Sequence, residues 1–338
     1  MKADDPELMA ALASVAEGPG DESRRRVLGD LLLERDDPRG EFLLLQFLIA
    51  ENKGSGRIRQ RADELWRSYK REWMAGADKL LTQVKLDRGF PVEAQLEPEV
   101  TPELLIASLG SPMLATLRRL SSTRYSSSEE AMVEAVASPR LRELREVMFH
   151  EPELFTRAAM RGVNGRLTSL HLDFVLTLED CGLLLDSPVF KSLTHLSTRG
   201  SAPPAPRKTS LWTRILPPPK LGPMAGLLER LSSHPSLKQP TVIGDAFGDL
   251  RRFAELAPVW PRLKLERLVS PGSFELTRDE KGTVLMLQNM STPDLISARP
   301  LVPAGTVQVL LMPRRDHDTS SREKLLEAYA GLNPRTLP

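Results

Sequence analysis

Residues 138–149 read SPRLRELREVMF: a serine and a proline, then leucines three residues apart, then apolar residues at alternate positions. Related stretches recur along the chain: SPMLATLRRLSS from Ser111, NGRLTSLHLDF from Asn164, SPVFKSLTHLST from Ser187, HPSLKQPTVIG from His234 and WPRLKLERLVS from Trp260. The proline position, which Gly165 fills in one copy, falls at 112, 139, 165, 188, 235 and 261. The intervals are therefore 27, 26, 23, 47 and 26 residues. Because 47 is about twice the shortest interval, we expect a degenerate unit or an insertion between Pro188 and Pro235.

Each interval contains the same order of elements. Val147 and Phe149 alternate at the end of their copy, as the side chains of a short strand do. Helix signals follow: the serines and glutamates at 126–130 form a capping cluster, and Pro152 stands at a first-turn position. The same signals predict a strand over 92–96, a helix that opens at Thr101, and helices over 178–185, 223–231 and 245–256.

A strand and a helix in each unit of roughly 20–29 residues is the arrangement of leucine-rich repeats. One such unit cannot bury both its strand face and its helix face, whereas stacked neighbours bury them together. We therefore predict an α/β fold with a curved solenoid, its strands on the concave side and its helices on the convex side. The Asn or Cys that usually follows the repeat strand is missing, so the turns must differ from the commonest type. The rival interpretation is an ordinary α/β sheet with chance similarity between units, which explains less well why six markers share one register.

The first 88 residues carry helical patterns. Helices are expected over 8–15, 21–32 and 41–50, where apolar residues recur at helical spacing. A long fourth helix is predicted from Ile58, because the three-to-four spacing of apolar residues continues as far as Val84. Its many arginines could form a basic surface for nucleic acid, but a solvated face against the acidic first 50 residues is the simpler interpretation.

Residues 28–46, LGDLLLERDDPRGEFLLLQ, resemble the repeat-companion domain of bacterial proteins with degenerate leucine-rich repeats. The usual pattern of that family is an Asp-Trp-Leu-x-Glu-x-Gly-Asp run, followed by Gly-Glu-Phe and Gln. The matching residues are Asp30, Leu32, Glu34, Asp37, Gly40, Glu41, Phe42 and Gln46. Leu31 replaces the Trp of the pattern and Asp36 its Gly, while RGFPV at 88–92 is similar to the family's link into the first repeat strand. The resemblance implies a helical companion domain, repeats behind it and a binding role, with no catalytic residues to carry over.

The composition is that of a soluble globular protein, with 41% hydrophobic residues, 27% charged residues and a net charge of +1. This balance argues against a dedicated nucleic-acid binder, which needs a basic surplus to neutralise phosphates. The N-terminus lacks the apolar core of a signal peptide, and no stretch approaches 18 uncharged apolar residues, so we expect no membrane insertion. Cys181 is the single cysteine, which excludes an intrachain disulfide and favours a cytoplasmic protein. We expect Cys181 itself to be a buried apolar residue and not a nucleophile.

Two segments depart from the repeat pattern. Residues 200–223 hold seven prolines, four basic residues and no acid. They are either a flexible loop or a docking segment, in which polyproline-like arms flank Trp212 and Arg214 and suit an acidic groove of a partner. Near the C-terminus, the pattern predicts a β-hairpin over 274–288, a third strand over 307–312 and a last helix over 322–329.

Three histidines accompany successive predicted strands: His150, His171 and His195. With Asp173 they could form a metal or acid–base cluster. However, they are staggered along their strands, which would leave neighbouring side chains roughly 8 Å apart, too far to share a zinc ion. A polar binding surface fits better, and no GxGxxG, Walker A, HExxH, GxSxG or CxxC motif occurs. Its predicted residues are Arg119, Ser121, Glu146, Met148, His150, Ser169, His171, Asp173, His195, Ser197 and Arg199, with Trp212 and Arg214 from the insertion.

The sequence thus predicts three domains: a helical repeat-companion bundle over 1–88, a leucine-rich-repeat-like βα solenoid over 89–271 and a small β-rich cap over 272–338. We expect a non-enzymatic protein-interaction module, such as a scaffold or regulatory subunit, that binds another protein on its concave strand face. It needs no cofactor and no metal. An immunity-type inhibitor of a toxin is the alternative. A hydrolase or metal-dependent enzyme that uses His171, Asp173 and His195 is a further one.

Overall fold

The computed structural model divides the chain into two compact units. Residues 1–168 with 187–190 form the N-terminal unit, and residues 169–186 with 191–338 form the C-terminal unit. The structure describes residues 5–74, 76–162, 165–199, 230–244, 262–267, 273–279, 282–290, 295–296, 299, 302, 306–313, 319–332 and 334–336. Both units combine helices with strands that pair mostly in parallel, which confirms a mixed α/β class. The three predicted domains remain a prediction.

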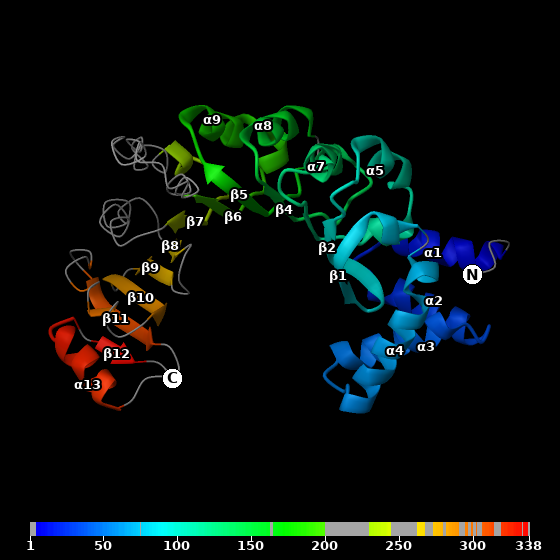
Figure 1. Ribbon diagram of the computed structural model, residues 1–338, viewed down its shortest axis with the longest axis horizontal. Coiled ribbons are helices and arrows are strands. Elements are labelled where there is room, and N and C mark those ends of the chain that lie inside the picture. Colours follow the sequence, from blue (N-terminus) through cyan, green and yellow to red (C-terminus); the bar gives the residue numbers. More distant parts are fainter. Residues whose placement is uncertain are drawn as a thin grey trace, which may run out of the picture. The chain divides into compact units, whose positions relative to one another are not determined.

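The N-terminal unit opens with helices (Figure 1). They are α1 (Pro6–Glu17), α2 (Glu22–Leu33), α3 (Pro38–Ala50) and α4 (Gly56–Trp73). Each begins at a residue whose side chain accepts a backbone N–H of the first turn, namely Asp5, Asp21, Asp37 and Ser55 in chain order. An aromatic cluster joins α3 to α4, because the ring of Phe42 lies 4.9 Å from that of Trp73 and 5.8 Å from that of Trp66. The helices expected over the first 50 residues are therefore present.

The predicted long helix is wrong beyond Trp73. The helix ends there, and Gly76 adopts a left-handed φ of 88° ahead of a short 3₁₀ turn. The segment that was expected to continue the helix forms strand β1 (Leu81–Asp87) instead. Pairing with a neighbouring strand outweighs the local helical spacing of Leu80 and Val84.

The partner of β1 is β2 (Phe90–Leu96), in antiparallel register. The turn between them consists of two left-handed residues, Arg88 at a φ of 47° and Gly89 at 77°. Two consecutive positive φ values are typical of the tightest β-hairpin connection. The strand expected over 92–96 is thus confirmed as part of a hairpin.

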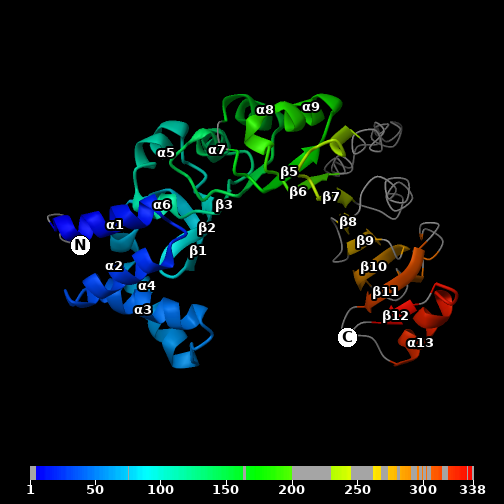
Figure 2. The same cartoon turned by 180° about the vertical axis from the view of Figure 1, so that it is seen from behind.

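Parallel strands and helices alternate after β2. They are α5 (Pro102–Ser108), α6 (Pro112–Ala115), β3 (Arg119–Ser121), α7 (Ser127–Ala137), β4 (Glu146–Phe149) and α8 (Pro152–Arg161). Figures 1 and 2 show α5, α7 and α8 on one side of β2, β3 and β4. Ala94, Leu120 and Val147 lie side by side across these three strands and are buried. The strand-and-helix alternation predicted from the repeats is present over this stretch.

The serine-proline marker of the repeats has a definite structural role. The Oγ atoms of Ser111, Ser138 and Ser187 each accept the backbone N–H of the residue two positions on, at 3.3, 3.1 and 3.3 Å. In its own copy, His234 occupies the serine position, and its Nδ1 accepts the N–H of Ser236 at 3.3 Å. These four markers therefore begin with a side-chain acceptor that fixes the local turn, while the markers at Asn164 and Trp260 lie outside the described residues.

The C-terminal unit also contains strands and helices. They are β5 (Ser169–Val175), α9 (Leu178–Asp186), β6 (His195–Arg199), β7 (Gln239–Gly244), β8 (Arg262–Arg267), β9 (Ser273–Asp279), β10 (Gly282–Met290), β11 (Thr306–Pro313), α13 (Thr319–Ala328) and β12 (Pro334–Thr336). Neighbours from β5 to β8 pair in parallel, β9 pairs antiparallel with both β8 and β10, and β10, β11 and β12 pair in parallel. The predicted hairpin near the C-terminus is confirmed, with Gly282 at its turn.

Several predictions concern residues that the structure does not describe. The insertion at 200–223, the helix expected over 245–256 and most of the helix expected over 223–231 lie outside the described residues. Within the described part of the chain, no helix is long and apolar enough to cross a membrane.

Candidate functional site

The predicted strand residues of the N-terminal unit lie at alternate positions on β3 and β4. Arg119 is exposed, and Ser121, Glu146 and Met148 are partly exposed, while the residues between them are buried. This alternation places the four predicted side chains on the strand face opposite the buried one. The period-two pattern that suggested these residues therefore assigns the face of each strand correctly.

A row of alternating charges runs across this face. Lys85 Nζ lies 3.0 Å from Glu93 Oε2, Arg119 Nη1 lies 3.4 Å from the same oxygen, and Arg119 Nη2 lies 2.8 Å from Glu146 Oε2. The four residues sit at paired positions on β1, β2, β3 and β4, so the row follows directly from the strand register. The hydrogen bond to Glu146 raises the pKa of Arg119. We call these four residues the charge row.

A second polar group lies where β3 and β4 end. The side-chain amide of Gln95 donates to the carbonyl oxygen of Ser122 at 3.3 Å, and His150 Nε2 lies 3.4 Å from that same oxygen. The Oγ of Ser122 and the Oε2 of Glu129 are buried with no hydrogen-bond partner. Burial raises the pKa of Glu129, whose other carboxylate oxygen accepts the N–H of Tyr125. Sequence reasoning included His150 but interpreted Glu129 only as part of a helix-capping cluster and gave Ser122 no role, so it missed both buried atoms.

The predicted residues of the C-terminal unit lie on β5 and β6. Ser169 pairs with His195 and His171 with Ser197 across the two strands. Arg199 is 8% exposed and Ser197 is 7% exposed, so neither offers much surface to a partner. His195 is exposed, and His171 is partly exposed.

The arrangement of these side chains bears on the enzymatic alternative. Arg199 Nε donates to Asp173 Oδ1 at 2.5 Å, and a second guanidinium nitrogen contacts the same oxygen. His195 Nδ1 lies 2.8 Å from Thr194 Oγ1, and His171 Nε2 lies 3.5 Å from Ser169 Oγ. Asp173 is thus engaged by the guanidinium group of Arg199. Across the described residues, no three His, Cys, Asp or Glu side chains are close enough to hold a metal ion. Trp212 and Arg214 lie outside the described residues.

Comparison with family models, with curated proteins and with solved structures finds no match for this chain. The resemblance of residues 28–46 to the repeat-companion domain therefore stays an expectation. A function must be proposed from the strand face and the helices themselves.

Proposed function

We propose that this chain is a non-enzymatic protein-interaction module that binds a partner protein on the strand face of β2, β3 and β4. The charge row carries this proposal. Four side chains of alternating sign stand at one level across four strands, and Lys85 and Arg119 are 71% and 50% exposed. An extended surface patterned in this way selects a partner by complementary charges, which set the orientation and the rate of association.

The ion pairs within the charge row are weak enough for a bound protein to replace them. Exposed pairs of this kind contribute only about 0.2–1 kcal/mol each to stability, because water already solvates both charges. A partner can therefore replace the pair between Arg119 and Glu146 with its own contacts at little cost. The polar group at His150 and Gln95 would extend the contact toward the ends of the strands.

We further propose that this face belongs to a leucine-rich-repeat-like solenoid, with a repeat-companion helical bundle before it and a β-rich cap behind it. The recurring acceptor at Ser111, Ser138, Ser187 and His234 supports a common repeat geometry. Such a face would serve a scaffold subunit or an inhibitor of a toxin equally well, because each of them binds a protein.

A charge swap on the row tests the proposal. The full-length chain is used to capture a partner from native lysate, and the captured protein is purified and titrated. The variant Arg119→Glu/Glu146→Arg keeps the pair between these two positions but reverses its polarity toward a partner. We expect it to weaken binding by about tenfold or more while remaining folded.

The matched control is Arg157→Glu/Glu130→Arg, because this exposed pair joins α7 and α8 on the helical side of the same unit, with 3.6 Å between nitrogen and oxygen. The control should bind like the wild-type chain. Equal binding by the strand-face variant would overturn the proposal, and so would the absence of any stoichiometric protein partner.

A further inference from the structure

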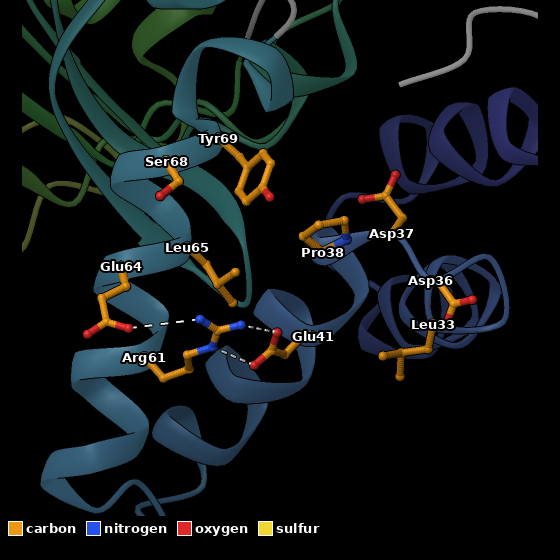
Figure 3. A pocket seen from close by; sticks show the side chains of 10 residues that line it. All are labelled: Leu33, Asp36, Asp37, Pro38, Glu41, Arg61, Glu64, Leu65, Ser68 and Tyr69. Carbon is orange, nitrogen blue, oxygen red and sulfur yellow. Dashed lines mark hydrogen bonds and ion pairs between the residues drawn. The ribbon is translucent and has the colours of Figure 1, made fainter.

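A cavity of about 400 Å³ opens in the N-terminal unit, between α4 and the turn that joins α2 to α3 (Figure 3). It falls within the range of about 300–1,000 Å³ that is common for ligand pockets. Leu33, Pro38 and Leu65 give it apolar walls, and Tyr69 adds an aromatic ring, which stacks on Trp73 at 5.3 Å. This pocket is made by helices and their connecting turn, and no residue of the charge row lines it.

The charges around the pocket are mostly negative. Asp36, Asp37, Glu41 and Glu64 line it, against the single cation Arg61. Arg61 is already neutralised, because it donates two hydrogen bonds to Glu41, at 2.7 and 2.8 Å, and lies 3.9 Å from Glu64. These bonds lower the pKa of Glu41, so its carboxylate is ionised at neutral pH.

The two aspartates are held at the pocket by the backbone. Asp36 has a left-handed φ of 53°, and Asp37 caps α3, its Oδ1 accepting the N–H of Arg39 at 2.8 Å. Among the described residues, no side chain donates a hydrogen bond to either carboxylate; the guanidinium of Arg39 contacts the Sδ of Met113 instead. Two carboxylates, on exposed Asp36 and half-buried Asp37, thus lie across the pocket from Tyr69 (Figure 3), and no described cationic side chain is bound to them.

We infer that this pocket receives a basic side chain from a segment of a partner protein. The aliphatic stem of an arginine or lysine would pack on the leucines, Pro38 and Tyr69, while its charged end meets Asp36 and Asp37. Charge complementarity favours a basic side chain over the other kinds. An acidic side chain would meet four carboxylates, and an apolar side chain would desolvate the two aspartates without compensation. The inference concerns a second surface and does not depend on the strand face.

The peptide acetyl-Gly-Arg-Gly-amide serves as the probe, titrated into the full-length chain while backbone amide shifts are recorded by NMR. Its counterpart with citrulline in place of arginine has nearly the same shape without the charge. We expect saturable shifts confined to residues 33–41 and 61–69. The citrulline peptide should bind about tenfold more weakly, and added salt should weaken the arginine peptide.

The variant Asp36→Asn/Asp37→Asn removes both charges and keeps the local structure, because Asn tolerates a left-handed φ and caps helices as Asp does. It should bind the arginine peptide about fivefold or more weakly. The control Asp30→Asn/Asp63→Asn removes two exposed charges that do not line the pocket, and should bind like the wild-type chain. Equal binding of the two peptides, shifts centred elsewhere, or unchanged binding by the pocket variant would each overturn the inference. None of these results bears on the charge row.

Discussion

Two arginines of the N-terminal unit contact the ring of Phe90, and their surroundings differ sharply. The guanidinium carbons of Arg25 and Arg39 lie 5.3 and 5.5 Å from the ring centroid. Arg25 also donates to the carbonyl oxygens of Pro19 at 2.6 Å and of Asp87 at 3.0 Å. Within the described part of the chain, the Arg39 guanidinium donates only to the Sδ of Met113, a weak acceptor, and burial lowers the pKa of Arg39 to about 10. Arg25 is therefore the better compensated of the two buried cations, although its Nε has no hydrogen-bond partner among the described residues.

This difference predicts effects of different size for the same substitution. Arg25→Met should lower the free energy of unfolding by about 2–4 kcal/mol, because it removes the donor to two carbonyl groups and an ion pair to Asp87, whose carboxylate keeps its bonds to Arg88. Arg39→Met should change it by less than about 1 kcal/mol, since an apolar side chain of similar length avoids the cost of burying a charge. Urea unfolding followed by circular dichroism measures both. Equal losses in the two variants would show that Arg39 has compensation comparable to that of Arg25.

Cys181 is fully buried, as the sequence predicted for a small apolar residue on α9. Burial raises the pKa of its thiol to about 11, and Asp180 contributes in the same direction. Because the pKa of an unfolded cysteine is about 8.5, the folded chain binds the proton more tightly than the unfolded chain. The resulting stabilisation is complete below the unfolded pKa and is lost as the pH rises toward the folded pKa.

We therefore expect the free energy of unfolding to fall between about pH 8.5 and 11 more steeply in the wild-type chain than in Cys181→Ala. Urea titrations at a series of pH values measure the difference between the two curves, which cancels groups that titrate in both chains. A thiol reagent should also react slowly with the folded protein at neutral pH. Parallel pH curves in the two chains would rule out a perturbed thiol.

At the scale of elements, the hairpin between β1 and β2 depends on a glycine. Gly89 has a φ of 77°. A Cβ atom there would lie 2.2 Å from the Cδ2 atom of Leu43, a buried residue of α3. Gly76 has a similar φ of 88°, but a Cβ atom there would meet nothing within 4 Å. The two positions share one conformational constraint and differ only in the space around them.

Alanine substitutions at the two glycines separate these effects. Gly76→Ala should lower the free energy of unfolding by about 1 kcal/mol, from the left-handed φ alone. Gly89→Ala should cost about 2 kcal/mol more, because the side chain of Leu43 must move within a packed core. Thermal or urea unfolding of both variants provides the comparison, and equal losses would mean that the core at Leu43 adapts freely.

The elements that could be predicted are those whose pattern is local. Helix α7 begins at the predicted cluster of serines and glutamates, although Ser126 makes no side-chain cap hydrogen bond, and α8 begins at the predicted first-turn proline. Strand β4 follows from the alternation of Val147 and Phe149. Strand β1 could not be predicted, because the spacing of Leu80 and Val84 also fits a helix and only pairing with β2 decides between them. Strand β12 covers just Pro334–Thr336 and carries no pattern at all; it forms by pairing with β11.

The candidate sites follow the same rule. The side of the sheet on which Arg119 and Glu146 stand could be predicted from alternation. Their mutual ion pair required the register between strands, which a single sequence does not contain. The pocket beside Asp36 could not be predicted, because it depends on how α4 packs against the turn between two earlier helices.

At the scale of the whole molecule, the net charge of +1 conceals local pairing between segments. The basic helix α4 was interpreted as a solvated face against the acidic first 50 residues, and Arg61 does bind Glu41 of that segment. Arg35 likewise binds Asp5 and Glu7, and Arg26 binds Glu51. Arginines thus link helices of the N-terminal unit to one another, and a composition total cannot reveal that arrangement.

The imidazole of His234 takes the place of a serine hydroxyl, and this affects how well sequence comparison detects the repeated unit. A search that compares amino-acid letters scores histidine against serine as a mismatch, although both side chains here offer one acceptor to the N–H two residues on. In the copies that begin at Ser111, Ser138, Ser187 and His234, the shared feature is an acceptor lone pair at one position, which either serine or histidine supplies. Two proteins built from the same unit can then share little sequence identity. An alignment that scores hydrogen-bond donors and acceptors would relate them, whereas one that scores residue identity would not.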